Sequence, residues 1–251
     1  MTGAVSAAPV IEIFHSVQGE GRYAGRATTF VRTAKCPIRC RYCDTPNSYR
    51  ATDVASVRGA DEACEVANPL EAVHALELAE SVTGPGPRLL SITGGEPLVH
   101  PEFVATLGRH ARERGFLVHL ETAALDPDAL ARCLEHVDHV SADYKLASTL
   151  QRGDHAASHL ECVRRAVDAQ RTVDVKLVVL ADTPSEEIDR ALSALAPHRD
   201  SILLIVQPVT PFGEVTEVPD AAAVLAIAGQ AAGMGFDVRV LPQLHKTLGV
   251  D

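Results

Sequence analysis

The sequence lacks long apolar runs and any excess of positive charge, and both absences narrow what the chain does. None of its 251 residues falls in a stretch of about 20 apolar residues, the length that crosses a membrane. Lys and Arg number 23 against 33 Asp and Glu, so the formal net charge is −10. This balance argues against nonspecific nucleic-acid binding, which needs clustered Lys and Arg. We therefore expect neither a membrane nor nucleic acid among the partners.

Signals for export and for disulfide bonding are also missing. The first ten residues, MTGAVSAAPV, contain no basic segment and no long apolar core, so no signal peptide is expected. The six cysteines do not form the pattern of a secreted disulfide framework. Cys133 and Cys162 fall within helical patterns and are predicted to be packing residues, because a free cysteine behaves as a small buried hydrophobe. These features favour a cytoplasmic location.

The chain has no visible internal boundary. No linker or low-complexity segment interrupts it, and its length with 46% hydrophobic residues suits one large domain over 1–251. Residues 1–9 are mostly small and are predicted to be a disordered lead-in. Residues 50–68 lose periodicity and gather Asp, Glu and Gly, which predicts an irregular insertion that caps one face. Gly19, Gly21 and Gly25 do not form the dinucleotide-binding pattern G-x-G-x-x-G.

What the sequence does contain is a regular alternation of strand and helix patterns. Helices are predicted at 69–82, 101–114, 127–136, 155–169, 184–196 and 220–233, and strands at 27–32, 88–93, 116–121, 139–142, 173–180, 201–206 and 236–241. Such alternation predicts an α/β fold with a parallel sheet and right-handed crossovers. We expect an incomplete (β/α) barrel rather than a flat doubly wound sheet, although the pattern fits both.

Polar residues stand at the carboxyl ends of these predicted strands, where function gathers in a parallel barrel. The strand ends carry TGGEP at 93–97, Glu121 and Thr122, the segment 141–145, Lys176, Gln207, and the segment 243–246. Ordinary loops would need only turn-forming residues at these places. The coincidence predicts one shared pocket.

Three cysteines stand close together in KCPIRCRYCDTPNSY, at residues 35–49. Three residues separate Cys36 from Cys40 and two separate Cys40 from Cys43, so the thiolates can converge on one iron–sulfur cluster. Three ligands on a four-iron cluster leave one iron free to bind a small molecule. A tetrahedral structural zinc would need a fourth ligand. Asp44 and Cys64 are the nearest later candidates but do not sit at the usual second-pair spacing, whereas His15 leaves this alternative open.

The cysteine spacing, with Tyr42 just before the last cysteine, resembles the signature of radical S-adenosylmethionine enzymes. The resemblance implies a [4Fe-4S] cluster on the three cysteines, whose open iron binds S-adenosylmethionine and cleaves it to a 5′-deoxyadenosyl radical. TGGEP resembles the Gly-Gly-Glu-Pro strand end of the same enzymes, which holds the methionine ammonium. Two glycines let a ligand amine approach the backbone, and Glu96 complements its charge.

Four segments resemble, more narrowly, the 7-carboxy-7-deazaguanine synthase family of 7-deazapurine (queuosine-type) biosynthesis. They are HSVQGEG at 15–21, CDT at 43–45, ITGGEP at 92–97 and QLHK at 243–246. The resemblance implies a lyase that contracts 6-carboxy-5,6,7,8-tetrahydropterin to 7-carboxy-7-deazaguanine with loss of ammonia. It also implies the cluster, S-adenosylmethionine and Mg²⁺ as cofactors, a low-potential reductant of flavodoxin type, and a homodimer.

The same resemblance assigns roles by position. Beside the pterin it places Val17, Gln18, Gly19, Arg32, Thr93 and His245. We add Glu20, because a carboxylate can accept two parallel N–H bonds from a guanidine-like edge. For S-adenosylmethionine we expect Tyr42, Cys43, Asp44, Gly95, Glu96, Glu121, Ser141, Lys145 and Gln207. Thr45 is the expected Mg²⁺ ligand, since a hard cation prefers oxygen. No residue is assigned as a general acid or base.

Two segments depart from the family pattern, and two other functions stay open. Where the family has Ser-Pro-Lys, residues 141–145 read SADYK, and where it has a glycine-containing turn after Glu-Thr this chain has Ala123 and Ala124. The Asp143-Tyr144-Lys145 stretch resembles the Asp-x-Lys of glycyl-radical-activating enzymes, which form the first alternative. The second is a non-catalytic iron–sulfur electron carrier or zinc-binding protein, which would leave TGGEP unexplained.

Overall fold

The computed structural model describes residues 6–59 and 62–250. Within them, ten strands form one sheet in the order β12-β11-β10-β9-β8-β7-β3-β2-β4-β5. These strands are β2 (Val10–Val17), β3 (Ala27–Thr33), β4 (Val54–Arg58), β5 (Ala63–Ala67), β7 (Leu89–Gly94), β8 (Leu117–Thr122), β9 (His139–Asp143), β10 (Thr172–Val179), β11 (Ile202–Pro208) and β12 (Asp237–Val240). The strands from β7 to β12 are all parallel, and β3 joins β7 in parallel.

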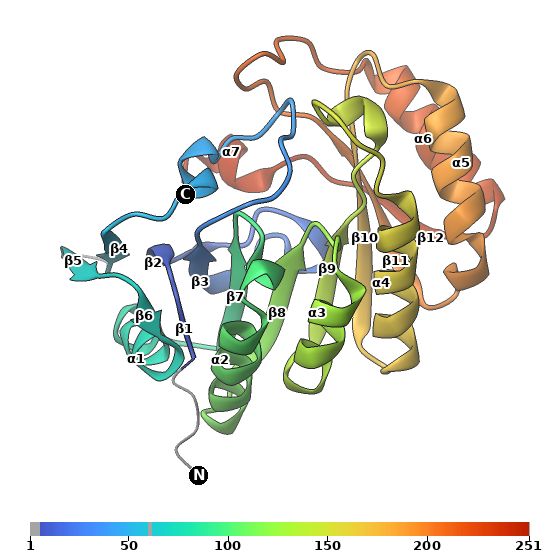
Figure 1. Ribbon diagram of the computed structural model, residues 1–251. Helices are drawn as coiled ribbons and strands as arrows, with labels where there is room; N and C mark the ends of the chain where they lie inside the picture. The colour runs from blue at the N-terminus through green and yellow to red at the C-terminus, as the bar shows by residue number, and fades with distance from the viewer. Residues whose placement is uncertain (1–5, 60–61, 251) are drawn as a thin grey trace.

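A helix precedes each of the six parallel strands. The helices are α1 (Ala72–Val82), α2 (Pro101–Glu113), α3 (Pro127–Cys133), α4 (Ala156–Asp168), α5 (Ser185–Leu195) and α6 (Ala221–Gly233). Figure 1 shows them following one another around the outside of the sheet, with α1 at one end and α6 at the other. Within the described residues β12 and β5 remain edges, so the barrel is open. The structure therefore confirms the predicted α/β fold with an incomplete barrel.

Local sequence explains where the helices begin. Proline occupies the first turn of α2 and of α3, where its missing N–H costs nothing. Asp126 caps α3 by accepting hydrogen bonds from the N–H groups of Asp128 (3.0 Å) and Ala129 (2.9 Å). Asp220 caps α6 in the same way through the N–H of Ala223 at 2.6 Å. Cys133 and Cys162 are fully buried in α3 and α4, which confirms them as packing residues.

Alternation along the strands separates an apolar outer layer from a polar interior. In β10, Val173, Val175, Leu177 and Val179 belong to the main hydrophobic core beneath the helices. The residues between them, including Asp174 and Lys176, point to the opposite face, because successive side chains of a strand alternate. β8 repeats the pattern with Val118 and Leu120 in the core and His119 and Glu121 on the other face. The concave side of the sheet is therefore lined by polar groups.

Some local predictions are wrong. Residues 1–5 lie outside the described residues, but Ala7–Ala8 form β1, which pairs with β6 (Leu70–Glu71), so the disordered lead-in does not extend over 6–9. The predicted irregular cap contains the hairpin of β4 and β5, which extends the sheet beside β2, although residues 60–61 are outside the described part. β2 and β3 are antiparallel, and residues 18–26 join them without the longer crossover that parallel strands need. The structure also adds a short helix, α7 (Leu244–Leu248).

No helix in the described parts of the chain is both long enough and apolar enough to cross a membrane.

Candidate active site

A cavity of about 380 Å³ opens at the carboxyl ends of the parallel strands, on the concave side of the sheet. Most residues predicted from the sequence line it together. They are Val17, Gln18, Gly19, Glu20, Arg32, Cys36, Cys40, Tyr42, Cys43, Asp44, Thr45, Thr93, Gly95, Glu121, Lys145, Gln207 and His245. Two predicted residues within the described chain, Glu96 and Ser141, are not among its lining residues. The cavity thus joins segments from both ends of the chain.

The cysteine loop forms one wall of this cavity. Cys36, Cys40 and Cys43 are all free thiols and half-buried. Burial raises the pKa of Cys36 to about 11 and also raises that of Cys40, so metal binding there must displace protons. In the described residues no three His, Cys, Asp or Glu side chains converge as a site for a single metal ion. Three free thiols facing one cavity suit the iron–sulfur cluster that their spacing predicts.

The TGGEP turn packs directly against that loop. The N–H of Gly95 donates to the carbonyl of Thr33 (2.9 Å), and the N–H of Glu96 donates to the carbonyl of Lys35 (2.8 Å). A Cβ on Gly95 would lie 2.3 Å from the Lys35 carbonyl oxygen, a distance that real Cβ atoms do not reach. Glycine is therefore required at position 95 so that the end of β7 can lie beside the cysteines.

Glu96 has a different place from the one expected. Its Oε1 accepts hydrogen bonds from the N–H of Leu98 (2.9 Å) and the hydroxyl of Thr122 (2.6 Å), and its Oε2 accepts from the N–H of Ala123 (2.7 Å). Burial raises the pKa of this carboxyl despite these bonds. Glu96 thus ties the end of β7 to the end of β8 and holds the turn in shape. A direct contact between Glu96 and a ligand stays a prediction.

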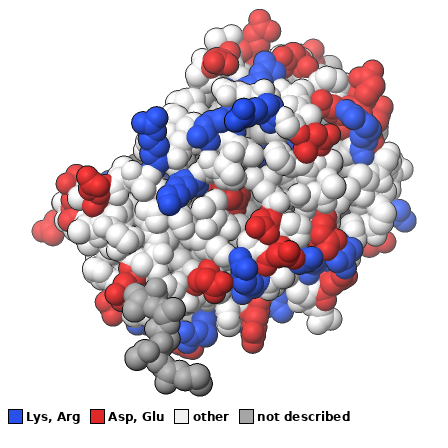
Figure 2. Space-filling view, viewed as in Figure 1, with Lys and Arg blue, Asp and Glu red and all other residues white. Residues whose placement is uncertain are grey.

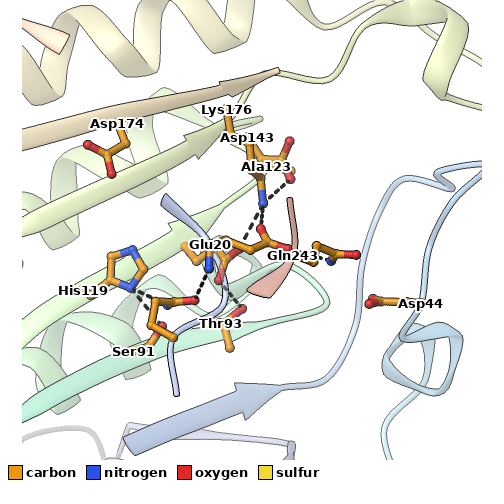
Figure 3. Close-up of polar contacts among 12 residues, drawn as sticks. Glu20, Asp44, Ser91, Thr93, His119, Ala123, Asp143, Asp174, Lys176 and Gln243 are labelled. Carbon is orange, nitrogen blue, oxygen red and sulfur yellow. Dashed lines mark hydrogen bonds and ion pairs between the residues drawn. The ribbon is translucent and has the colours of Figure 1, made fainter. Parts of the chain in front are cut away.

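Two lysines and three carboxylates form a charge network on the cavity floor. Figure 3 shows the part of it around Lys176, Glu20 and Asp143. Lys176 bonds to Glu20, and its Nζ lies 3.2 Å from both Glu121 Oε1 and Asp143 Oδ2. Asp143 Oδ2 also accepts a bond of 2.5 Å from Lys145. Gln243 also holds Glu20, since its Nε2 donates a hydrogen bond to Glu20 Oε1 at 2.7 Å. β8, β9, β10 and the loops at both ends of the chain meet at this point.

Electrostatics within the network divide the carboxyls into two kinds. Burial acts to raise the pKa of Glu20, but Lys176 and the bonds from Lys176 and Gln243 outweigh it and leave the value at about 2. The pKa of Asp143 is likewise lowered, since Lys145 and Lys176 outweigh the effect of its burial. Burial raises the pKa of Glu121 despite Lys176. Glu20 and Asp143 are therefore firmly ionised, and Glu121 is the carboxyl that takes up a proton most readily.

The SADYK segment now has a physical explanation. Its Asp143 and Lys145 both belong to the network, and Lys145 Nζ donates to the Tyr42 hydroxyl at 2.9 Å. Tyr42 lies between the last two cysteines in the sequence, so the end of β9 is linked to the cysteine loop. Ser141 points to the concave side too, but deeper, beside Gly21. Its expected contact with the cofactor stays a prediction.

The loop that joins β2 to β3 crosses the cavity floor and is anchored by buried polar residues. Asp174 is fully buried and accepts bonds from Arg22, 2.7 Å from the backbone N–H and 2.9 Å from Nε. Gln18 is also buried: its Nε2 lies 3.4 Å from His119 Nδ1, and its Oε1 accepts from the N–H of Glu20 at 3.2 Å. The polar atoms of Gln18 thus hold the loop that presents Glu20.

Two stacked histidines lie beneath this loop. The rings of His119 and His139 are 4.8 Å apart, and Tyr23 packs edge-on against both. Burial lowers the pKa of His119 well below its ordinary value, so this ring is neutral. His139 Nε2 lies 3.2 Å from Asp174 Oδ2 without the alignment of a hydrogen bond. The sequence analysis missed these residues, although polar side chains at the interior positions of otherwise apolar strands were a usable signal.

The two predicted basic side chains on the open side of the cavity already have partners. Arg32 Nε donates to Glu12 Oε1 at 2.7 Å, and the residue lines the cavity. His245 packs against Gly19, where a Cβ would lie 1.8 Å from His245 Nδ1. The next residue of α7, Lys246, pairs with Asp44 at 3.2 Å. The carboxyl-terminal helix therefore closes over both the QGEG loop and the cysteine loop.

The expected Mg²⁺ ligand lies at the mouth of the cavity. Thr45 Oγ1 lines the cavity and donates to Asp44 Oδ1 at 3.0 Å. Burial acts to raise the pKa of Asp44, but Lys246 and Thr45 lower it, so the carboxylate is charged. Oxygen atoms beside a charged carboxylate suit a hard cation.

Comparisons with known proteins agree with this geometry. Residues 30–195 match the model of the radical SAM superfamily. The chain is 36% identical to the 7-carboxy-7-deazaguanine synthase of Methanopyrus kandleri, over 94% of this chain and 92% of that protein. It is 32% identical to the enzyme of the same name from Geobacter sulfurreducens, over 95% of this chain and 96% of the relative.

A solved structure shares the fold. QueE from Escherichia coli superposes with a TM-score of 0.66 at 21% identity, and the match covers 95% of each chain. As a radical SAM protein, this chain uses a [4Fe-4S] cluster and S-adenosylmethionine, for which the three free cysteines and the adjoining turn are suited. The chain belongs to the radical SAM superfamily and, within it, to the family of the 7-carboxy-7-deazaguanine synthases.

Proposed function

We propose that this chain contracts the ring of 6-carboxy-5,6,7,8-tetrahydropterin to form 7-carboxy-7-deazaguanine, with loss of ammonia. The observation that carries the proposal is the 36% identity to a named synthase along nearly the whole chain. Support comes from the cavity, which is lined by the cysteine loop, by the carboxylate of Glu20 and by the basic side chains of Arg32 and Lys176. A glycyl-radical-activating enzyme is not proposed, since its defining likeness is confined to SADYK.

The polar groups of the cavity complement the two ends of this substrate. Glu20 presents an ionised carboxylate, and a carboxylate accepts the paired N–H groups of a 2-aminopyrimidinone edge. Arg32 lines the same cavity, and its planar fork suits the carboxylate of the substrate. Thr93 and His245 also line the cavity, and we assign them as side walls for the ring.

Tyr42, Cys43, Asp44 and Gly95 are the residues that we assign to S-adenosylmethionine. The cluster and S-adenosylmethionine together supply the radical that takes a hydrogen atom from the substrate. The chain's own contribution is to hold the substrate at a fixed distance and to exclude water from the reacting carbon. The two lysines offset most of the negative charge of the floor carboxylates, so the substrate enters a preorganised electrostatic environment.

We further assign Mg²⁺ to Thr45, with Asp44 beside it and the substrate carboxylate as a further oxygen ligand. A cation at this position would fix the carboxylate end of the ring and stabilise negative charge during rearrangement. The chain is also proposed to work as a homodimer and to receive its electrons from a low-potential carrier, both by likeness to the family.

Conservative variants of Thr45 test the Mg²⁺ assignment. Thr45→Ser keeps the hydroxyl, whereas Thr45→Val keeps the shape without it. We expect Thr45→Val to raise the Mg²⁺ concentration for half-maximal formation of the deazaguanine by about tenfold or more, the effect of losing one metal contact, and Thr45→Ser to stay near the native value. An unchanged Mg²⁺ response in Thr45→Val would reject the assignment.

Cys40→Ala is expected to lose both the brown colour of the cluster and turnover.

A further inference from the structure

The ion pair between Arg22 and Asp174 lies under the loop that joins β2 to β3, and it differs from the pairs at the surface. Figure 2 shows many Asp and Glu side chains beside Lys and Arg on the visible face, and such exposed pairs contribute little to stability. The Asp174 side chain, in contrast, is 0% exposed. Among the described residues, Arg22 is the only Lys or Arg that pairs with it. This buried carboxylate therefore depends on one residue of the loop for its charge compensation.

A second ion pair joins the same loop to the same strand with the charges reversed. Lys176, two positions after Asp174 in β10, bonds to Glu20, two positions before Arg22 in the loop. Figure 3 shows Asp174 and Lys176 projecting from β10 to the same side, as residues two apart in a strand do. Gly21, at φ 64°, turns the backbone between the two charged residues of the loop. We call these two contacts the crossed ion pairs.

The crossed ion pairs hold the loop in one register on β10. Sliding the loop by one pair would place Glu20 against Asp174, or Arg22 against Lys176, and like charges repel in a buried site. Asp174 fixes both the main chain and the side chain of Arg22, since it accepts from the backbone N–H at 2.7 Å and from Nε at 2.9 Å. The position of Glu20 follows from these bonds, because one residue separates it from Arg22.

We propose that Asp174 is a positioning residue that, through Arg22, sets the selectivity of the site for pteridines that carry a 2-amino group. This inference rests on the proposed function, in which the Glu20 carboxylate accepts the paired N–H groups of that edge. A paired contact needs both carboxylate oxygens at hydrogen-bond distance and well aligned, so a small displacement of the loop breaks it. Neither Asp174 nor Arg22 is among the residues that line the cavity, so both act through Glu20.

The test compares two double variants of the oxygen-free holoenzyme. Arg22→Met with Asp174→Asn removes both charges together, so that no uncompensated carboxylate stays buried. The matched control is Arg112→Met with Asp138→Asn, at the amino end of β9. Asp138 has the same kind of partners: an arginine Nε, that of Arg112, lies 3.1 Å from its Oδ1, and a backbone N–H, that of Val118, donates to its Oδ2 at 2.8 Å.

Three quantities are measured with S-adenosylmethionine present and without a reductant, so that no turnover occurs. Calorimetry gives the Kd of 6-carboxypterin and that of 6-carboxylumazine, which has an oxo group in place of the 2-amino group. Hydrogen–deuterium exchange gives the exchange rate of the backbone amides of residues 19–25. The Kd of S-adenosylmethionine reports whether the rest of the cavity is intact.

We expect the native protein to bind 6-carboxypterin at least about tenfold more tightly than 6-carboxylumazine, because the oxo group would place an acceptor against the Glu20 carboxylate. The variant without Arg22 and Asp174 should lose this preference through a Kd for 6-carboxypterin about tenfold higher, the effect of one lost charged contact. Its loop amides should exchange at least about tenfold faster, since local opening becomes easier. Its affinity for S-adenosylmethionine should stay within about twofold of the native value, as for a distant site.

Two comparisons separate positioning from a general loss of structure. The control variant should match the native protein in all three measurements. Arg22→Lys, which keeps the positive charge beside Asp174, should retain most of the preference for 6-carboxypterin. If the double variant does not fold, Arg22→Met alone replaces it with the same expected loss, because the Arg22 side chain is 34% exposed and its removal is less disruptive.

An unchanged preference in the variant would overturn the proposal even if the loop amides exchanged faster, because the pair would then only stabilise the fold. An equal loss in the control, or an equal loss of affinity for S-adenosylmethionine, would overturn it too. A native protein without the preference would contradict the proposed substrate and, with it, this inference. That result is seen before any variant is measured, so the two failures can be told apart.

Discussion

Replacing Lys176 by methionine tests the charge network on which the cavity floor is built. Lys176 is only 4% exposed and contacts Glu20, Glu121 and Asp143. Without its ammonium, three carboxylates whose side chains are 11–22% exposed share the single charge of Lys145. Removing one partner of a buried ion pair costs about 3–5 kcal/mol, a large part of the roughly 5–15 kcal/mol that holds a domain folded. We expect urea unfolding at pH 7 to report a loss of this size.

The pH dependence of that loss is a sharper measurement. In the native protein the pKa of Glu20 is about 2 against an ordinary 4.5. A lowered pKa contributes stability that is present above about pH 4.5 and is lost as the pH falls toward 2, here about 3 kcal/mol. In Lys176→Met, burial is no longer opposed by that charge, and the carboxyl pKa values rise. The variant should therefore become more stable as the pH falls from 7 to 4.5. Over the same range Glu20 does not change the stability of the native protein.

Two further variants control this experiment. Lys246→Met removes an ammonium whose side chain is 43% exposed and should cost at most about 1 kcal/mol, as exposed pairs do. Lys176→Met with Glu121→Gln removes the carboxyl that is hardest to ionise and should recover about 1–3 kcal/mol of the loss through coupling. A cost below about 1 kcal/mol for Lys176→Met, or no gain on acidification, would refute the network as described.

Three other substitutions probe the backbone around the site. Gly19→Ala should displace His245, since the new Cβ would lie 1.8 Å from its Nδ1, and turnover should fall about tenfold or more while the melting temperature changes little, as measured by product formation and circular dichroism. Gly95→Ala places a Cβ 2.3 Å from the Lys35 carbonyl oxygen and should reduce the iron bound per chain after reconstitution; full iron content would contradict the packing described. Ala124 has φ 52°, so Ala124→Gly should relieve about 1–2 kcal/mol of backbone strain. The same change removes a buried methyl group and increases the entropy of the unfolded chain, and both effects oppose the gain. The free energy of unfolding in urea should therefore change by less than about 1 kcal/mol.

The parallel strands and their helices could be predicted because each leaves a strong local pattern. β10 alternates apolar residues over eight positions, and α2 and α3 begin at prolines, so the predicted ranges agree with the observed bounds within a few residues. The hairpin of β4 and β5 could not be found in this way. Each of its strands has only five residues, and β5 is mostly exposed. The position of the hairpin depends on the pairing of β4 with β2.

The members of the site could be predicted better than their contacts. Cys36, Gly95 and His245 stand in segments with distinctive local sequence. The bond between Lys176 and Glu20 joins residues 156 positions apart, and the one between Gln243 and Glu20 spans 223. No local pattern encodes such pairings, which follow from the closure of the sheet.

The most direct test of the account is the product balance of the reconstituted, oxygen-free chain. It is incubated with 6-carboxy-5,6,7,8-tetrahydropterin, S-adenosylmethionine, Mg²⁺ and a reductant, and 7-carboxy-7-deazaguanine, ammonia and 5′-deoxyadenosine are quantified by liquid chromatography and mass spectrometry. The account predicts equal amounts of deazaguanine and ammonia, with many molecules of each formed for every molecule of S-adenosylmethionine consumed. Accumulation of 5′-deoxyadenosine without any deazaguanine would contradict it.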